Sequence, residues 1–161
     1  MDMQKKPTNS EGRILQYGIV GFWLLFWLFN VIDKFIGGSI FLWVGKDRLA
    51  QLVQYFTSIG IENPNAALGF LIFITVVQII ALSLLALTLW HLTLGTDSKA
   101  HRFFFWGTVA GLFMFTFFSI GDQIFGDRAE LLEHTTFWMA ILVSWGAYTY
   151  ILKLQSKDIQ S

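Results

Sequence analysis

Residues 66–90 read AALGFLIFITVVQIIALSLLALTLW, which is the longest apolar run in the chain. Of these 25 residues only Gln78, the thirteenth, is strongly polar. A helix needs about 20 predominantly apolar residues to cross the hydrocarbon core of a bilayer. The preceding Asn63 and Pro64 form a helix start signal, because an asparagine side chain can accept a bond from a free backbone N–H and proline suits the first turn. This stretch therefore predicts a membrane-spanning helix.

The composition of the whole chain supports the same class. The 161 residues are 55% hydrophobic and only 14% charged, whereas a soluble domain carries about 25% charged residues. A soluble protein of this size could not bury so much apolar surface, so lipid has to cover it. The absence of cysteine excludes disulfides and thiolate metal sites, and a net charge of zero gives no basic field for nucleic acid. We expect one membrane domain, residues 1–161, with the lipid bilayer and not nucleic acid as its partner.

Three further apolar runs predict three more spans. We expect the four spans at about residues 14–36, 66–90, 103–121 and 135–152. Over about residues 46–59, apolar side chains recur at helical spacing with polar ones on the other faces, which is typical of a helix lying at the membrane interface. Residues 40–44 before it are expected to dip into the same interface. The prediction is an all-α membrane protein: a four-transmembrane-helix bundle with a short amphipathic interfacial helix between spans 1 and 2.

Basic residues flank the spans unevenly. The side with both termini and the 91–102 loop has seven: Lys5, Lys6, Arg13, Lys99, Arg102, Lys153 and Lys157. The opposite side has four: Lys34, Lys46, Arg48 and Arg128. Because short cytoplasmic loops are enriched in Lys and Arg, both termini are predicted to lie on the cytoplasmic side of the cytoplasmic (inner) membrane. Interfacial belts are expected from Trp23, Trp90 and Trp106 near that side and from Trp43 and Trp138 near the other.

A primary amide near the centre of the bilayer needs hydrogen-bond partners. Gln78 lies mid-span, with Thr75 one helical turn away on the same face. Its amide either bonds to a neighbouring helix and holds the bundle together, which is the commoner role, or contacts a ligand such as a quinone carbonyl inside the bundle. Both interpretations stay open at the level of sequence.

Polar residues also close the first and third spans. Asp33 and Asp122 begin two similar segments, DKFIG and DQIFG, and a duplicated chain would place both at one site. Ionisable residues at membrane depth are default candidates for function, although a lysine near a helix end commonly extends to the head groups. The candidate ligand-binding or quinone-binding residues are therefore Asn30, Asp33, Lys34, Gln78 and Asp122.

Two further groups of residues carry weaker signals. Glu130, Glu133 and His134 precede the fourth span and could offer ligands to a divalent metal. The helix dipole alone favours acidic residues at a helix start, so no metal is assigned and the three remain weak candidates. Gly107 and Gly111 have the spacing of a helix-packing face, against a neighbour inside or outside the chain.

The order of these features resembles the DoxX/DoxD-like family of small four-span membrane proteins. The matching residues are Arg13 before the first span, Lys34-x-x-Gly37 at its end, Tyr55-Phe56-x-x-x-Gly60-Ile61 after the amphipathic stretch, and Asn63-Pro64. The likeness covers about residues 13–92, and the rest of the chain is similar by topology. Members of the family commonly carry a glutamate where this chain has the uncharged Gln78.

The resemblance implies an accessory or quinone-proximal membrane subunit of an oxidoreductase complex. Its partners would be other subunits of that complex and its ligand a quinone, as for the membrane subunit of thiosulfate:quinone oxidoreductase. The sequence contains no redox cofactor motif, so an electron carrier would belong to a partner or be the quinone itself. The alternative is a noncatalytic structural or assembly subunit of a larger membrane complex. A small transporter is less well supported, because four spans with one central amide offer no evident ion pathway.

Overall fold

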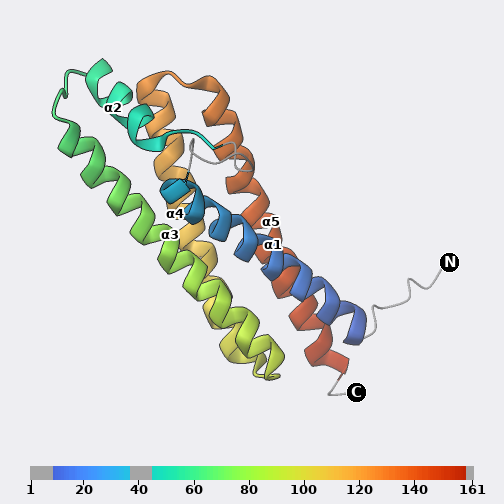
Figure 1. Ribbon diagram of the computed structural model, residues 1–161. Coiled ribbons are helices and arrows are strands. Elements are labelled where there is room, and N and C mark those ends of the chain that lie inside the picture. The colour runs from blue at the N-terminus through green and yellow to red at the C-terminus, as the bar shows by residue number, and fades with distance from the viewer. Residues whose placement is uncertain (1–8, 37–44, 159–161) are drawn as a thin grey trace.

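The structure, a computed structural model, describes residues 9–36 and 45–158. These residues form five α-helices: α1 (Asn9–Ile36), α2 (Arg48–Ser58), α3 (Pro64–Thr93), α4 (Asp97–Phe125) and α5 (Arg128–Asp158). The four long helices run side by side as a bundle, and α2 lies across one end of it near the turn between α4 and α5 (Figure 1). We call this the α2 end. The start of α1, the α3–α4 turn and the last turns of α5 form the opposite end (Figure 1).

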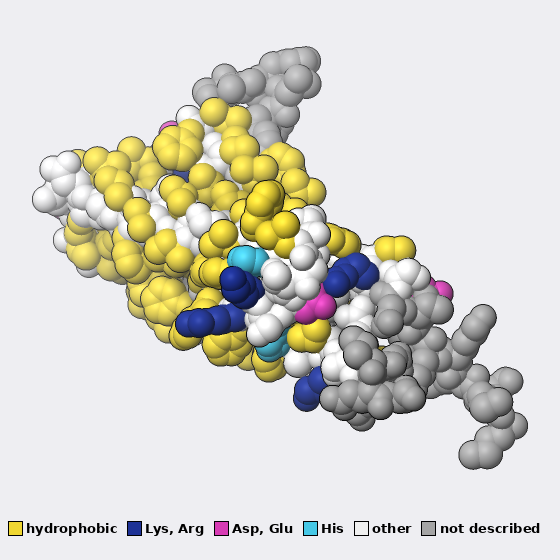
Figure 2. All heavy atoms as spheres, turned by 90° about the horizontal axis from the view of Figure 1, so that it is seen from below, with side chains coloured by type: hydrophobic (Ala, Val, Ile, Leu, Met, Phe, Trp, Pro, Cys, Tyr) yellow, Lys and Arg dark blue, Asp and Glu magenta, His cyan; other side chains and the backbone are white. Residues whose placement is uncertain are grey.

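The predicted fold class is confirmed. Four helices are long and apolar enough to cross a membrane, and they cover Ser10–Ile36, Pro64–Thr93, Asp97–Phe125 and Arg128–Ser156. Hydrophobic side chains cover much of the surface that Figure 2 displays, as contact with lipid requires. The helices of the third and fourth spans, α4 and α5, begin six and seven residues before the apolar runs that predicted these spans. The additional residues are polar ones at the level of the head groups, which continue the helix. A 29-residue helix is about 44 Å long at about 1.5 Å per residue, which matches a bilayer with its head groups.

Local signals explain where α2 and α3 begin. The Asp47 carboxylate accepts a bond from Ala50 N at the start of α2, and the Asn63 side chain accepts one from Asn65 N just before Pro64. Gly60, with φ of +85°, follows the end of α2 as expected from a glycine. The helix predicted at about 46–59 is therefore present as α2, whereas the dip predicted at 40–44 lies outside the described residues.

Aromatic residues are the largest side chains of the core, and one interfacial prediction was wrong. Trp23 is 1% exposed, and its indole N–H donates to Ser144 Oγ at 3.0 Å, so it belongs to the bundle core instead of a lipid-facing belt. It lies on the inward face of α1 together with Trp27, which is also fully buried. Trp90 and Trp106 are 61% and 51% exposed, as expected of belt residues. Trp43 lies outside the described residues.

The glycine face of α4 packs inside the chain. A Cβ at Gly107 would lie 3.4 Å from the Leu85 side chain of α3, and one at Gly111 would collide with Ile141 Cδ1 of α5. Both glycines are buried. The close approach of α4 to its neighbours therefore depends on the absence of side chains at these two positions.

Candidate functional site

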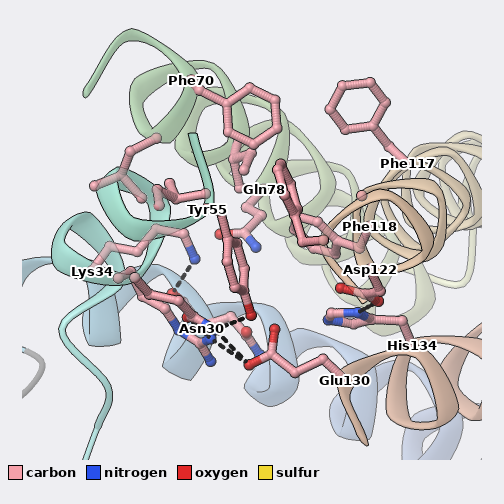
Figure 3. A pocket seen from close by; sticks show the side chains of 17 residues that line it. Asn30, Lys34, Tyr55, Phe70, Gln78, Phe117, Phe118, Asp122, Glu130 and His134 are labelled. Atoms are coloured by element: carbon pink, nitrogen blue, oxygen red, sulfur yellow. Dashed lines mark hydrogen bonds and ion pairs between the residues drawn. The ribbon is translucent and has the colours of Figure 1, made fainter. Parts of the chain in front are cut away.

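A cavity of about 110 Å³ opens at the α2 end, and every helix contributes to its wall (Figure 3). Its polar lining comes from Asn30, Lys34, Arg48, Gln51, Tyr55, Gln78, Asp122, Glu130 and His134. Its apolar lining includes Phe70 of α3 and Phe117, Phe118 and Phe125 of α4. A cavity of roughly 150 Å³ accommodates a benzene molecule, so this one approaches the size of a single six-membered ring.

Four of the five candidate ligand-binding residues line this one cavity: Asn30, Lys34, Gln78 and Asp122. They come from three different spans and lie up to 92 positions apart in the sequence. The fifth, Asp33, does not line the cavity. Its carboxylate lies 3.6 Å from Arg48 Nε, and Arg48 is part of the wall.

The polar residues near the end of α1 bond to backbone carbonyls one turn earlier in the same helix. Asn30 Nδ2 donates to Phe26 O at 2.9 Å, and Lys34 Nζ donates to Asn30 O at 3.0 Å. Only the carbonyls of residues 33–36 lack a helical partner, so neither bond caps α1. The lysine nevertheless lies in the last turn, where the helix dipole favours a positive charge. The Lys34 side chain lines the cavity, whereas a lysine near a helix end commonly extends to the head groups (Figure 3).

Gln78 is the deepest polar residue of the cavity wall. It is 1% exposed, and its Oε1 has no hydrogen-bond partner among the described residues. Thr75, the expected neighbour, instead donates its hydroxyl to Leu71 O at 2.7 Å. A buried amide oxygen without a partner costs about 1–3 kcal/mol. The Gln78 amide is therefore a group that a bound ligand or water would satisfy.

Asp122 and His134 form a buried pair across the α4–α5 turn. A hydrogen bond of 2.6 Å joins His134 Nδ1 to Asp122 Oδ2, and Asp122 is 4% exposed (Figure 3). The left-handed Gly126, with φ of +75°, reverses the chain between the two helices so that the two side chains face each other. Phe118 lies against the imidazole with ring centroids 4.8 Å apart. Because Nδ1 is held by the carboxylate, Nε2 is the ring nitrogen available to a ligand.

Glu130 ties α2 to α5. Its Oε1 accepts bonds from Lys46 Nζ at 2.5 Å, Gln51 Nε2 at 3.0 Å and Arg48 Nη1 at 3.3 Å. Tyr55 of α2 makes a second connection, because its ring stacks on Phe125 with centroids 4.7 Å apart. These contacts fix the position of α2, which forms one wall of the cavity.

The sequence did not predict that α2 lines the cavity, nor that His134 bonds to Asp122. Arg48 and Gln51 were interpreted as part of the polar side of a helix lying at the membrane interface, and Tyr55 was noted only for the family resemblance. The i, i+3, i+7 spacing puts the three side chains on one face of α2, but a face turned to solvent has the same spacing, so the sequence did not separate the two cases.

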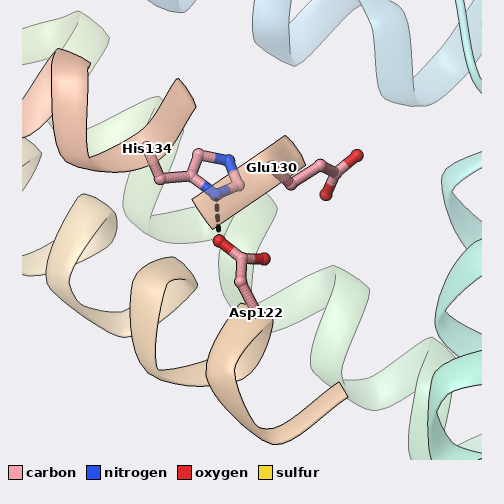
Figure 4. Close-up of side chains that lie close together, drawn as sticks. All are labelled: Asp122, Glu130 and His134. Atoms are coloured by element: carbon pink, nitrogen blue, oxygen red, sulfur yellow. Dashed lines mark hydrogen bonds and ion pairs between the residues drawn. The ribbon is translucent and has the colours of Figure 1, made fainter. Parts of the chain in front are cut away.

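Three side chains lie close enough to share a metal ion. One ligand atom from each of Asp122, Glu130 and His134 falls within 4.8 Å of the other two (Figure 4). The weak metal candidates from sequence were Glu130, Glu133 and His134. The structure groups Glu130 and His134 with Asp122 instead of Glu133, because Glu133 is exposed and does not line the cavity. Glu130 already neutralises Lys46 and Arg48, and Asp122 already bonds His134. The described contacts therefore satisfy this cluster with the protein's own charges.

Asp127 is half-buried beside the cavity and bonds to Tyr55 of its wall. The backbone N–H of Glu130 and the hydroxyl of Tyr55 donate to the Asp127 carboxylate, at 3.0 and 2.7 Å, and hold the pKa of Asp127 below its usual value. Burial and the bond to Asp127 raise the pKa of Tyr55 to about 12, so its hydroxyl stays protonated at neutral pH. The stabilisation from Asp127 is present above the unfolded carboxyl pKa of about 3.9 and is lost as pH falls through the lower folded pKa.

Replacing Tyr55 with phenylalanine is expected to raise the pKa of Asp127 toward its usual value, because one of the hydrogen bonds to the carboxylate is removed. The measurement is an NMR titration of ¹³C-labelled aspartate carboxyl groups in detergent micelles. Tyr150→Phe is the matched control, since Tyr150 is 64% exposed and remote from the cavity. An unchanged Asp127 titration in Tyr55→Phe would show that the hydroxyl does not reach the carboxylate.

The fold and the cavity define a four-span membrane protein with a polar, aromatic-lined cavity at one end of its bundle. Comparison of the chain with protein-family models, with curated proteins and with solved structures finds no match. The chemistry of the cavity is therefore the basis on which a function is proposed.

Proposed function

We propose that the cavity binds the head group of a quinone and that the chain is a quinone-proximal membrane subunit of an oxidoreductase complex, related to the DoxX/DoxD-like family. The observation that carries this proposal is the meeting of Lys34, Gln78 and the Asp122–His134 pair in one cavity of ring size, walled by phenylalanines. Ligand sites of this kind are mostly apolar, with a few polar groups that set the orientation.

The polar groups suit both redox states of a quinone. A quinone carbonyl accepts hydrogen bonds, and the Lys34 ammonium and the Gln78 amide N–H are donors. A hydroquinone hydroxyl also donates, and the unpartnered Gln78 Oε1 is an acceptor for it. Phe118 and Phe125 provide flat apolar faces for the ring.

Reduction of a quinone to a hydroquinone consumes two electrons and two protons. The electrons would come from a partner redox subunit. One proton would come from an imidazolium at His134 through Nε2 and the second from the Lys34 ammonium, which lines the same cavity, and both groups would be reprotonated from the aqueous side at the cavity opening. The Asp122 carboxylate, 2.6 Å from Nδ1, orients the ring so that Nε2 is the nitrogen available to the quinone.

The orientation follows from the basic residues. Both termini and the α3–α4 turn belong to the side with seven Lys and Arg residues, so we place that side in the cytoplasm of a cell with a cytoplasmic (inner) membrane. The cavity then opens near the outer face, which is where a partner subunit would dock over α2.

Gln78→Leu tests the proposal. It keeps the approximate volume and removes both hydrogen-bonding atoms, so affinity for a short-chain quinone is expected to fall at least tenfold, which corresponds to about 1.4 kcal/mol. Binding is measured by equilibrium titration of the purified chain in mild detergent. Gln16→Leu is the matched control, because Gln16 is equally buried but lies outside the cavity.

Equal affinities of wild type and Gln78→Leu, or an equal loss in Gln16→Leu, would contradict the quinone site. A wild-type chain that binds no quinone but is recovered with other subunits of a membrane complex would indicate the alternative, a noncatalytic assembly subunit. Mass spectrometry of the complex purified in mild detergent supplies that second measurement.

A further inference from the structure

A second cavity lies at the opposite end of the bundle, between the last turns of α3 and the first turns of α4. Its volume is about 460 Å³, and its wall consists of Leu84 and His91 of α3 and Lys99, Arg102, Phe103 and Trp106 of α4. We call it the α3–α4 groove. Figure 2, which views the molecule from below, shows Lys, Arg and His side chains gathered beside an acidic one, with a largely hydrophobic surface on one side of them.

The groove is basic, and no carboxylate contributes to its wall. Lys99 and Arg102 are exposed, and neither forms an ion pair within the described part of the chain. The nearest acidic residue in the sequence, Asp97, is held by Arg13 of α1 at 2.5 Å. The positive charge of the groove is therefore left for a ligand from outside the chain.

The lining residues follow an order along the membrane normal. From the α3–α4 turn toward the bilayer centre, α4 presents Lys99 and Arg102 first and Trp106 last, and antiparallel α3 presents His91 first and Leu84 last. Seven helical residues span about 10 Å. Cationic side chains thus lie at the depth of lipid phosphates, with apolar and aromatic side chains about 10 Å deeper, at the depth of the upper acyl chains.

Aromatic contacts shape the apolar part of the groove. The His91 ring stacks parallel on Phe103 with centroids 5.3 Å apart, while its Nδ1 bonds to Thr96 Oγ1 at 2.8 Å. Trp106 is half exposed and flanks this stack at the deeper end. The imidazole is therefore fixed in place, with its edge at the same level as the basic residues.

We propose that the α3–α4 groove binds an anionic phospholipid. Lys99 and Arg102 contact the phosphate, and an acyl chain lies along Leu84, Phe103 and Trp106. Basic pockets between transmembrane helices are suited to anionic head groups, and the graded lining of this groove matches a phospholipid better than a free anion. The proposal is independent of the quinone cavity, which lies at the other end of the bundle.

The test compares Lys99→Gln/Arg102→Gln with Lys153→Gln/Arg128→Gln. Both variants lose two positive charges, but Lys153 and Arg128 are exposed residues outside the groove. Retention of phosphatidylglycerol and of phosphatidylcholine is measured by native mass spectrometry of the full chain, released from nanodiscs containing equal amounts of the two lipids. We expect wild type and the control to retain phosphatidylglycerol at least tenfold better than phosphatidylcholine, and the groove variant to lose this preference.

Equal retention of the two lipids by wild type, or an equal loss in both variants, would overturn the proposal. Displacement of the lipid by millimolar inorganic phosphate would also overturn it, because the groove would then be a simple anion site. Unfolding temperatures of the three proteins are compared in the same detergent. The groove variant should match the control, since both changes are on the surface.

Discussion

Gly111→Leu is expected to lower the free energy of unfolding by about 1–3 kcal/mol, the usual cost of overpacking a filled core. Even a single Cβ at this position would collide with Ile141 Cδ1 and lie 3.5 Å from Trp27 Cζ2. Ile141 and Trp27 are both buried, so neither can move aside without disturbing α5 or α1. The measurement is unfolding of the purified protein in mixed micelles with increasing SDS.

Gly18→Leu is the control for this change. Gly18 is also helical, in α1, but no atom lies within 4 Å of an added Cβ, so leucine there should face lipid at little cost. A second variant, Gly111→Leu combined with Ile141→Ala, should recover part of the lost stability, because the smaller side chain provides space. Equal stability of Gly111→Leu and Gly18→Leu would mean that α4 does not pack against α5 at this point.

Glu130→Ala is expected to release α2 from the bundle. The buried carboxylate accepts bonds from three residues of the α2 region, among them Arg48 and Gln51. Loss of charge-assisted bonds at a buried acceptor costs about 1–3 kcal/mol, while Lys46, with 59% of its side chain exposed, should contribute little of this. We therefore expect hydrogen exchange of the α2 amides to become at least tenfold faster, with the four spans unaffected.

Glu133→Ala is the matched control, because Glu133 lies on the same helix one turn later and is exposed. Its replacement should leave the exchange of α2 unchanged. If both variants exchange like wild type, α2 is held by other contacts, such as the Tyr55–Phe125 stack. Because α2 forms one wall of the cavity, Glu130→Ala should also weaken quinone binding, whereas Glu133→Ala should not.

The four spans could be predicted from sequence because a bilayer imposes a simple physical rule. A segment that crosses the hydrocarbon core must be apolar over about 20 residues and must satisfy its own backbone hydrogen bonds as a helix. Residues 66–90 meet this condition without any knowledge of the neighbouring helices. The helices α4 and α5 begin before the apolar runs 103–121 and 135–152, because hydropathy marks the depth of lipid and not the limits of helical hydrogen bonding.

Side-chain direction was harder to predict, because successive residues of a helix differ by about 100°. Trp23 is of a residue type that is common in interfacial belts, yet its side chain points into the bundle and donates a hydrogen bond to Ser144. Acidic residues give a second example, because Glu133 is exposed and lies outside the cluster, whereas Asp122 is buried and belongs to it. An aromatic or acidic residue in an apolar helix can face lipid, solvent or core, and composition alone does not separate these cases.

The sequence by itself determined that the chain spans a membrane four times, that a short helix precedes the second span, and that Asn30, Lys34, Gln78 and Asp122 are unusual at their depth. Only the tertiary structure decided that these four line one cavity, that His134 pairs with Asp122, and that α2 closes the site through Glu130. The physical reason is that hydropathy and helix signals are local, over about 20 residues. Partners in the folded bundle are set by packing between segments that can be more than 80 residues apart, as in the bond between Lys46, just before α2, and Glu130 of α5, which are separated by 84 positions.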